Sequence, residues 1–322
     1  MGVDLAPLIV RETIELQRIE KERIAVDANN ILHQFLSSIR TTEGSPLRDL
    51  EGNITSHLIG LLFRSTALIH DHRTHLIFVF DGSPPELKKG EMRRRRKRRE
   101  KATREWKEAL EKGDYATAKT IAVRSGRLTS PMLQDAKKLL DLLGIPYVQA
   151  PGEAEAQSAH LARKGDVWAT NSRDYDSLLF GTPCLLRYLT ASRKPELITL
   201  HRLLSDHEIS REQLVDIAIL MGTDYNEGIT GVGPKTALKL IKKHGSIEGL
   251  PKDKGSKLTE DFEEVRKLFL KPEITTEYAL KYGELEEEGV YKFLCYEREL
   301  SRDRVETAVE RMKDFYSQRG RN

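Results

Sequence analysis

Short apolar runs alternate with amphipathic stretches over the first 180 residues of the chain. The runs ERIAVDAN (22–29), HLIFVF (75–80) and the first part of GIPYVQAPGEAEAQSAHLARKG (144–165) are bounded by turn residues, and each predicts a strand. Helical spacing follows the first and third runs. The runs DVWAT (166–170) and SLLFG (177–181) are also strand-like. Strands that alternate with helices predict an α/β fold, with a mostly parallel central sheet flanked by helices.

Residues 86–130 interrupt this alternation. The segment is too long and too charged for an ordinary connection between strands, so it predicts one or two helices that project from the sheet. The segment 214–245 predicts a helix, a loop, a Gly-Val-Gly-Pro hairpin and a second helix, which begins at Pro234 and ends before Gly245. Beyond residue 250 the pattern is helical and polar, and the last residues, FYSQRGRN, are expected to form an unstructured tail.

The composition is that of a globular protein with a packed core, since 39% of its 322 residues are hydrophobic. The longest apolar stretches, 57–63 and 75–80, fall short of the roughly 20 residues that cross a bilayer, so no membrane span is expected. Two cysteines, Cys184 and Cys295, are too few for a disulfide framework or for a zinc site of their own. We therefore expect an intracellular, reducing compartment.

The net charge of +3 conceals a concentration of positive charge. Between Lys88 and Arg104 the chain has eleven Lys or Arg residues and two acids, Glu91 and Glu100. Such a run is often a solvated helix face or a disordered arm. Because the run repels itself unless an anion lies against it, it also predicts contact with nucleic acid.

Acidic residues stand at the ends of predicted strands, at the start of the helix after the third strand, and in the 214–245 loop. They are Asp27, Asp81, Glu153, Glu155, Asp174, Asp176 and Asp224. In parallel sheets the ligand site lies beyond the carboxyl ends of the strands, so these carboxylates are expected at one site. Asp174 and Asp176 repel each other by about 1 kcal/mol in water and roughly four times that near a partly buried surface. They require an open loop or a counter-charge.

No Cys or His accompanies these acids, and an all-oxygen ligand set suits Mg²⁺ or Mn²⁺ better than zinc. The set is too large for one ion and fits two, as in enzymes that displace phosphoryl groups. Single members have other interpretations: Asp27 and Asp81 can be helix caps or turn residues, and Glu153 and Glu155 converge only in the first turn of a helix. The recurrence of acids at several predicted strand ends favours a shared metal site over these separate roles. The histidines of HDHRTH (70–75) lack metal-ligand spacing and are expected in a solvated turn.

The stretch ITGVGPKTA (229–237) has the pattern of a helix-hairpin-helix. Its glycines, Gly231 and Gly233, let backbone N–H groups approach a phosphate, and the helix that begins at Pro234 points its positive end the same way. Many plain turns contain Gly-x-Gly, but the lysines that follow, beginning with Lys235, favour DNA binding.

With these residues assembled, the sequence resembles the flap endonuclease family of structure-specific 5′-nucleases, and its archaeal branch in particular. The resemblance covers nearly the whole chain. It is carried by the motifs AVDAN, TSHLIGLLFR, FVFDGSPPELKKGE, GIPYVQAPGEAEAQ, RDYDSLLFG and MGTDYNEGITGVGPKTA. It implies a single nuclease domain with a PIN-like 5′-nuclease fold. Its parts are expected at 1–85 (N-terminal nuclease region), 86–130 (helical arch), 131–224 (internal nuclease region), 225–250 (helix-hairpin-helix) and 251–322 (C-terminal helical region).

The resemblance implies that all seven acids hold two Mg²⁺ ions, which Mn²⁺ can replace. It also implies that Lys88 and Arg95, on a helix above the metals, act on the scissile phosphate. Residues 86–130 would then form an arch through which a single-stranded 5′ flap passes.

Further positions match the family's DNA contacts. Arg40 and Arg64 match positions near the DNA, and His33 stands where many members have a tyrosine that stacks on a base. The hairpin, with Gly231, Gly233 and Lys235, matches the family's contact with the duplex backbone. The carbonyls of Gly228, Ile229 and Val232 match its monovalent-cation site, which takes K⁺.

The function that follows is metal-dependent cleavage of DNA at 5′-flap junctions, with associated 5′–3′ exonuclease activity, in Okazaki-fragment processing and DNA repair. The expected partner is DNA with a 5′ flap. The family's sliding clamp is a further partner, although this sequence ends without the clamp-binding peptide. The resemblance implies a monomer without membrane contact, cytoplasmic in an archaeal cell or nuclear in a eukaryote.

Two other functions fit parts of the pattern. One is a sister 5′-nuclease that acts on bubbles, junctions or 5′ ends. The other is a non-catalytic protein that binds branched DNA, which the acids disfavour because a pure binder gains nothing from anions beside phosphate.

Overall fold

A computed structural model of the chain describes residues 2–42, 44–114, 116–117, 120–121, 127–190, 193–251 and 262–319. The strands are β1 (Glu12–Thr13), β2 (Arg23–Asp27), β3 (His75–Phe80), β4 (Tyr147–Gln149), β5 (Ala169–Asn171), β6 (Cys184–Arg187) and β7 (Glu196–Thr199). The helices are α1 (Ala28–Ser38), α2 (Ser56–His72), α3 (Lys89–Glu111), α5 (Ser130–Leu142), α6 (Ala154–Lys164), α7 (Asp176–Leu179), α8 (Leu200–His207), α9 (Arg211–Met221), α10 (Pro234–His244), α12 (Phe262–Leu270), α13 (Glu287–Tyr291) and α14 (Arg302–Arg319). Four short helical turns join them, at Ala6–Leu8, Leu16–Ile19, Glu86–Lys88 and Lys292–Glu297.

The strands form one sheet in the order β1-β7-β6-β5-β2-β3-β4. The five strands from β6 to β4 are parallel, while β7 and β1 at the other edge pair antiparallel. The predicted α/β fold with a mostly parallel sheet is therefore confirmed. Asp27 at the end of β2 pairs with Val79 of β3, two residues before Asp81, so both carboxylates lie at the same edge of the sheet.

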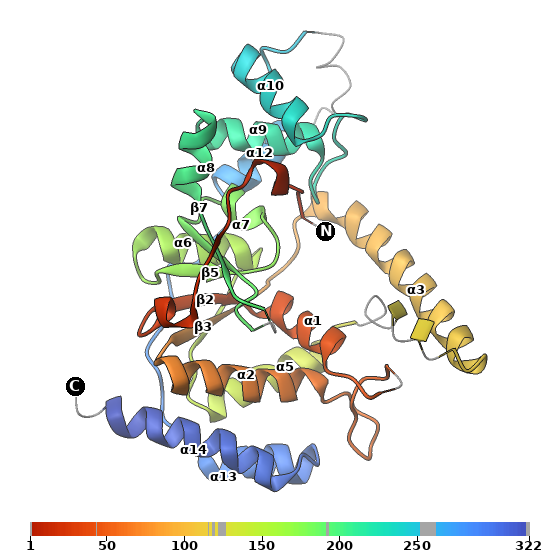
Figure 1. Cartoon of the computed structure of the whole chain (residues 1–322), viewed down its shortest axis with the longest axis vertical. Coiled ribbons are helices and arrows are strands. Elements are labelled where there is room, and N and C mark those ends of the chain that lie inside the picture. The colour runs from red at the N-terminus through yellow and green to blue at the C-terminus, as the bar shows by residue number, and fades with distance from the viewer. Residues whose placement is uncertain are drawn as a thin grey trace.

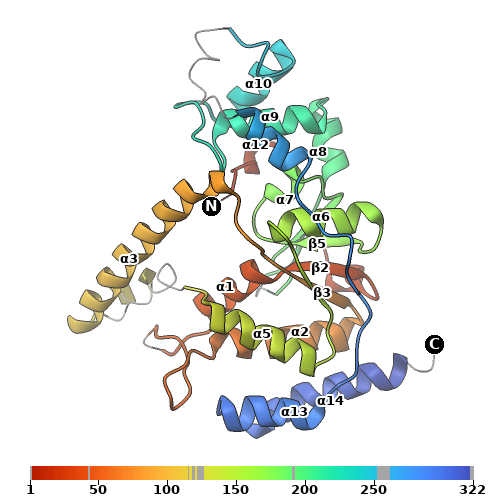
Figure 2. The same ribbon diagram turned by 180° about the vertical axis from the view of Figure 1, so that it is seen from behind.

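Helices cover both faces of the sheet in layers (Figures 1 and 2). On one face, α1, α2 and α5 pack against the sheet through residues such as Phe35, Leu61 and Phe78, and α13 and α14 add an outer layer. On the other face, α6 to α9, α10 and α12 bury a second cluster that includes Leu178 and Ile219. All of these side chains are buried, because each helix presents an apolar stripe to the sheet and β3 contributes Phe78 from the sheet itself.

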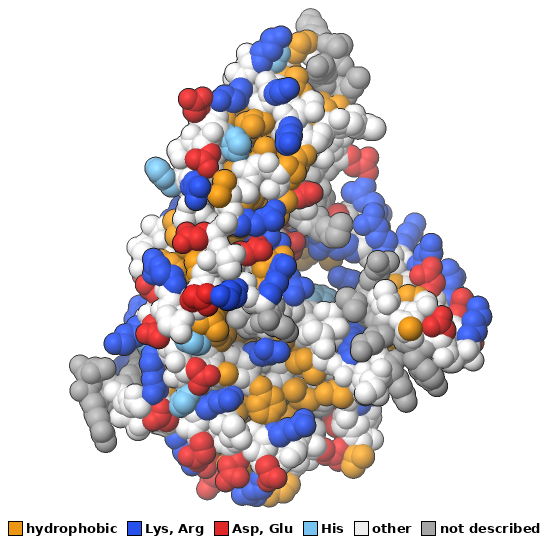
Figure 3. All heavy atoms as spheres, viewed as in Figure 1, with side chains coloured by type: hydrophobic (Ala, Val, Ile, Leu, Met, Phe, Trp, Pro, Cys, Tyr) orange, Lys and Arg blue, Asp and Glu red, His pale blue; other side chains and the backbone are white. Residues whose placement is uncertain are grey.

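Helix α3 leaves this layered body and projects as an arm (Figures 1 and 2). Its sequence, KGEMRRRRKRREKATREWKEALE, is helix-forming and mostly exposed, and it buries a narrow strip that includes Glu91, Ala102 and Ala109. In the space-filling view the arm stands off from the body, and Lys and Arg side chains dominate much of its surface (Figure 3). This agrees with the projecting helix predicted for the first part of residues 86–130. Part of that segment, including residues 122–126, lies outside the described residues.

Three local predictions are wrong. The run SLLFG is mainly helical, because it follows Asp176 into the single turn of α7. The terminal FYSQR continues α14, where Phe315 is buried in the core, and residues 320–322 lie outside the described residues. The histidines of HDHRTH do not lie in a solvated turn: His70 and His72 are in the last turn of α2, and His75 begins β3 and makes edge contacts with the rings of Tyr282 and Phe315.

No helix among the described residues is both long and apolar enough to cross a membrane.

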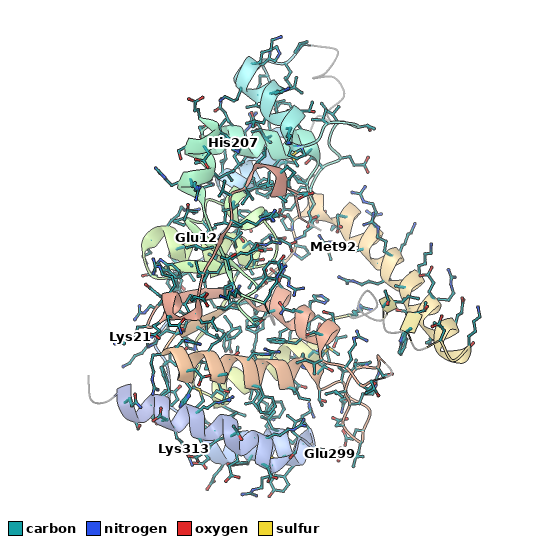
Figure 4. The ribbon with its side chains drawn as sticks, viewed as in Figure 1. Glu12, Lys21, Met92, His207, Glu299 and Lys313 are labelled. Atoms are coloured by element: carbon teal, nitrogen blue, oxygen red, sulfur yellow. The ribbon has the colours of Figure 1, made fainter. Side chains whose placement is uncertain are left out.

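Ion pairs and hydrogen bonds connect neighbouring elements in the helical layers on both sides of the sheet. His207 of α8 shares a hydrogen bond with the carbonyl of Leu8 at 2.7 Å, and Lys313 of α14 lies 2.7 Å from Glu287 of α13 (Figure 4). A further ion pair joins Arg266 of α12 to the buried carboxylate of Asp216 of α9 at 2.7 Å. Asp216 also accepts the backbone N–H of Ile247, so this one carboxylate holds three segments together.

Replacing Arg266 with Ala should lower the free energy of unfolding by about 3 kcal/mol, because it leaves the buried carboxylate of Asp216 without its counter-charge. Urea denaturation monitored by circular dichroism measures this. The control is Arg202→Ala on α8, whose exposed pair with Asp206 should contribute about 0–1 kcal/mol. Equal effects of the two substitutions would contradict the role given to Asp216.

Candidate metal centre

Three carboxylates meet beyond the ends of β3 and β4. One oxygen atom each from Asp81, Glu153 and Glu155 lies within 4.8 Å of the others. Asp81 follows β3, and its Oδ1 accepts the backbone N–H of Ala154 at 2.8 Å. Glu153 is the N-cap of α6 and Glu155 lies in its first turn, which is the position in which two glutamates at this spacing can converge.

Asp27 joins this group from the end of β2. Its Oδ1 caps α1 by accepting the backbone N–H of Asn30 at 2.9 Å, and its Oδ2 accepts the hydroxyl of Ser172 at 3.3 Å. The amide of Asn30 also donates to Oδ2 of Asp174 at 3.2 Å. Asp27 is thus a helix cap, as one interpretation of the sequence allowed, and it faces the other acids as well.

Asp176 and Asp224 complete the set of seven acids from α7 and from the loop after α9. Asp176 begins α7 and accepts the backbone N–H of Val3 at 2.8 Å, while Asp224 lies in the loop after α9. The charge of Asp176 interacts with those of Asp174 and Asp224. The fold therefore brings all seven predicted acids into one interacting group.

Burial and mutual repulsion raise the pKa values of several of these carboxyl groups. Burial, and then the charge of Asp81, raises the pKa of Asp27 to about 8. Burial, and then Asp174, raises the pKa of Asp176 to about 7. Burial followed by repulsion from Asp27 and Asp81 raises the pKa of Glu155 well above its ordinary value. The carboxylates thus repel one another in a poorly solvated place, where added cations stabilise their charged forms.

Two basic side chains from the base of the arm reach the group. Lys88, the last residue of the turn that leads into α3, pairs with Glu153 and lies 3.9 Å from Asp224. Arg95, two turns along, lies 2.5 Å from Asp224. Attraction to the carboxylates outweighs burial and raises the pKa of Lys88. Two cations cannot compensate seven carboxylates when all of them are ionised.

The residues fit a divalent metal. All seven donors are carboxylates, which are hard oxygen ligands that Mg²⁺ and Mn²⁺ prefer, and neither sulfur nor imidazole belongs to the group of three in closest contact. The excess of negative charge and the raised pKa values supply the electrostatic reason for cation binding.

The structure adds residues that the sequence did not single out. Glu91 lies one turn before Arg95 on α3, and its carboxylate is 2.6 Å from Nε of Arg95, so it holds the guanidinium toward Asp224. The spacing of four residues between Glu91 and Arg95 predicts such an ion pair on a helix, so the sequence could have indicated it. Asn30, three residues after the cap Asp27, could also have been found. The contact of Val3 with Asp176 had no signal, because 173 residues separate them.

The predicted DNA contacts outside the acids occupy several places. His33 lies on α1 and faces α3: burial, and then the charges of Arg99 and Arg95, lowers its pKa to about 4. Arg64 is exposed on α2. Arg40 donates to the carbonyls of Gly44 and Ser37, so its guanidinium supports its own loop.

The predicted hairpin joins α9 to α10. Gly231 has φ +81°, which favours glycine, and a Cβ at Gly228 would lie 2.2 Å from the backbone of Gly222. The N–H of Val232 donates to the carbonyl of Ile229 at 3.0 Å and closes the turn before Gly233 caps α10. Lys235, in the first turn of α10, is exposed.

Comparison with known proteins gives matches over almost the full length. Residues 1–102 match the XPG N-terminal domain and residues 144–224 match the XPG I-region. The chain is 46% identical to flap endonuclease 1 of Pyrococcus abyssi over 97% of this chain and 94% of that protein. It is also 46% identical to flap endonuclease 1 of Methanothermobacter thermautotrophicus, over 97% of this chain and 96% of that protein.

Solved structures give the same result. Flap endonuclease-1 from Methanococcus jannaschii superposes with a TM-score of 0.81 at 41% identity, covering 99% of this chain and 100% of that one. The catalytic core of Rad2 in complex with DNA substrate has a TM-score of 0.73 at 23% identity, covering 95% and 97%, which is a likeness of fold.

Replacing Glu155 with Gln should raise the melting temperature in EDTA by about 2–4 °C, because it removes a half-buried carboxyl that Asp27 and Asp81 repel. Added Mg²⁺ should then stabilise this variant less than the original chain. Thermal unfolding with EDTA and with Mg²⁺ measures both effects, and Glu288→Gln on α13 is the control. A lower melting temperature of Glu155→Gln in EDTA would show that the repulsion is not the dominant force at this position.

Proposed function

Because the chain belongs to the flap endonuclease family, we propose that it is a metal-dependent nuclease that hydrolyses the DNA backbone at 5′-flap junctions, in replication and repair. The observation that carries the proposal is the group of seven carboxylates with Lys88 and Arg95 directed into it. A protein that only bound DNA would be weakened by this group, since it repels phosphate.

The metal centre is proposed to take two divalent ions held by the seven acids, with Mg²⁺ as the resident ion and Mn²⁺ as a substitute. Asp81, Glu153 and Glu155 lie closest together and would hold one of them. Bound Mg²⁺ would supply Lewis acidity toward the phosphate and would favour ionisation of the attacking water. Hydrolysis adds this water across one P–O bond and leaves a 5′-phosphate and a 3′-hydroxyl.

The basic residues are proposed to act on the phosphate itself. Lys88 and Arg95 now pair with Glu153 and Asp224, and both can donate hydrogen bonds to phosphate oxygens once metal neutralises those acids. Their positive charges would stabilise the negative charge that grows on the phosphate in the transition state. Glu91 keeps the guanidinium of Arg95 in this direction.

The remaining contacts are proposed to position the DNA. The positive surface of α3 would attract the single-stranded flap, and the hairpin of α10 would hold the duplex backbone through Gly231, Gly233 and Lys235. Carbonyls of Gly228, Ile229 and Val232 would bind K⁺ there. His33, Arg40 and Arg64 would contact the DNA nearer the junction.

Cleavage of a labelled 5′-flap substrate with Mg²⁺, compared with bubble and four-way-junction substrates, tests the activity. Asp81→Asn should reduce the single-turnover rate by several factors of ten, each worth about 1.4 kcal/mol, because it loses a metal ligand. Flap binding should stay equal or become tighter, since a negative charge near phosphate is removed. Asp206→Asn on α8 is the control. Near-normal cleavage by Asp81→Asn would remove it from the metal centre, and preference for bubbles or junctions would favour a sister 5′-nuclease.

The proposed roles of the basic run predict unequal effects along it. Lys88→Ala or Arg95→Ala should lower the single-turnover rate at saturating DNA by at least about tenfold, with little change in affinity. Lys97 is exposed on α3, so Lys97→Ala should only weaken binding slightly and reduce its salt dependence. Equal small effects at the three positions would mean that the run only attracts DNA.

A further inference from the structure

Three arginines surround one tyrosine beside the metal centre. The guanidinium carbon of Arg193 lies 3.1 Å from the ring centroid of Tyr188, that of Arg187 4.8 Å and that of Arg173 5.6 Å. Arg173 follows β5, Arg187 ends β6, and Tyr188 and Arg193 belong to the connection between β6 and β7. We call these four residues the Tyr188 cluster.

The positive charge of the cluster is poorly compensated. Arg187 lies 3.3 Å from Glu196 and also donates to the hydroxyl of Tyr175 at 2.6 Å. Within the described ranges no ion pair joins Arg173 or Arg193 to a carboxylate, and both are exposed. The guanidinium groups of Arg173, Arg187 and Arg193 surround the same ring, so their like charges repel one another. An anion would relieve this repulsion.

Hydrogen bonds fix the cluster next to the carboxylates. The backbone N–H of Arg173 lies 3.4 Å from the amide oxygen of Asn30, whose amide nitrogen bonds to Asp174. Nε of Arg187 donates to the carbonyl of Arg173 at 3.0 Å. Farther along α1, Gln34 donates to the hydroxyl of Thr190 in the same connection as Tyr188. The cluster therefore borders the metal centre along α1.

The backbone of Tyr188 is held in an unusual conformation. Its φ is +62°, in the left-handed region that aromatic residues rarely adopt. This conformation places the ring among the three guanidinium groups. Because Arg193 covers the ring so closely, the ring serves to orient guanidinium groups and is not free to stack on a base.

We propose that the Tyr188 cluster is a phosphate-binding site that holds one backbone phosphate of the DNA beside the metal centre, independently of base sequence. Planar guanidinium groups bind phosphate oxygens through paired hydrogen bonds, and Tyr188 holds them in position for this. The proposal rests on the proposed function, since it assigns the DNA already bound at the carboxylates as the source of the phosphate.

The test compares Arg193→Gln with Lys194→Gln, its neighbour in sequence. Both substitutions remove one exposed positive charge, but Lys194 pairs with Glu15 outside the cluster. Binding of fluorescent 5′-flap DNA of two unrelated sequences is measured by anisotropy between about 50 and 200 mM salt, with Ca²⁺ in place of Mg²⁺.

For Arg193→Gln we expect about threefold to tenfold weaker binding for both sequences, and a salt-dependence slope reduced by about 1. Arg173→Gln should act in the same direction, and in the double variant the reduction of the slope should stay at about 1, because the cluster holds one phosphate. Lys194→Gln should change affinity and slope less. An unchanged slope overturns the proposal, even if affinity falls, because it means that the arginines only shape the loop.

The outcomes that contradict the nuclease proposal differ from those that contradict the proposal for the Tyr188 cluster. If the original chain binds flap DNA but does not cleave it with Mg²⁺, the nuclease proposal is wrong, while the salt slopes still decide the proposal for the cluster. If the original chain cleaves normally and Arg193→Gln keeps the full slope, only the proposal for the cluster is wrong.

Discussion

Mutual repulsion among buried carboxylates is the constraint on which the functional part of this structure depends. Seven acids gather at one edge of the sheet, and burial together with their neighbours raises the pKa values of Asp27, Glu155 and Asp176. Folding alone does not remove this cost. Backbone N–H groups and two basic side chains offset part of it, and a divalent cation is suited to offset the rest. The group of carboxylates therefore destabilises the folded protein when no metal is bound, and it is suited to the divalent ions that it would bind.

The layered body keeps this repulsive group together. Residues from β2, β3 and the first turn of α6 cannot move apart without breaking the parallel pairing of β2 with β3 and of β3 with β4. Asp81 accepts the N–H of Ala154, which links the loop after β3 to α6. The buried apolar clusters on both faces of the sheet supply the stabilisation that the acids remove.

Positive charge is arranged around the acids at two scales. Lys88 and Arg95 enter the group itself, where Glu91 orients Arg95, whereas the outer residues of α3 and the Tyr188 cluster lie beside it. In the proposed function, α3 and the Tyr188 cluster would attract polyanionic DNA, and Lys88 and Arg95 would meet it at the carboxylates. The small net charge of +3 therefore conceals surfaces of opposite charge that are separated in space.

The sequence by itself determined the α/β fold and the strand ends that carry acids, because strand and helix periodicity are local properties. It also predicted metal binding by those acids, because ligand chemistry follows from residue type. It also indicated the projecting basic helix. It misassigned SLLFG and FYSQR, whose conformations depend on packing around α7 and α14. Only the tertiary structure decided that Val3 contacts Asp176, that Glu91 points Arg95 at Asp224, and that Arg173 meets Tyr188 and Arg193. These contacts join segments through loop geometry and side-chain direction, which periodicity does not encode.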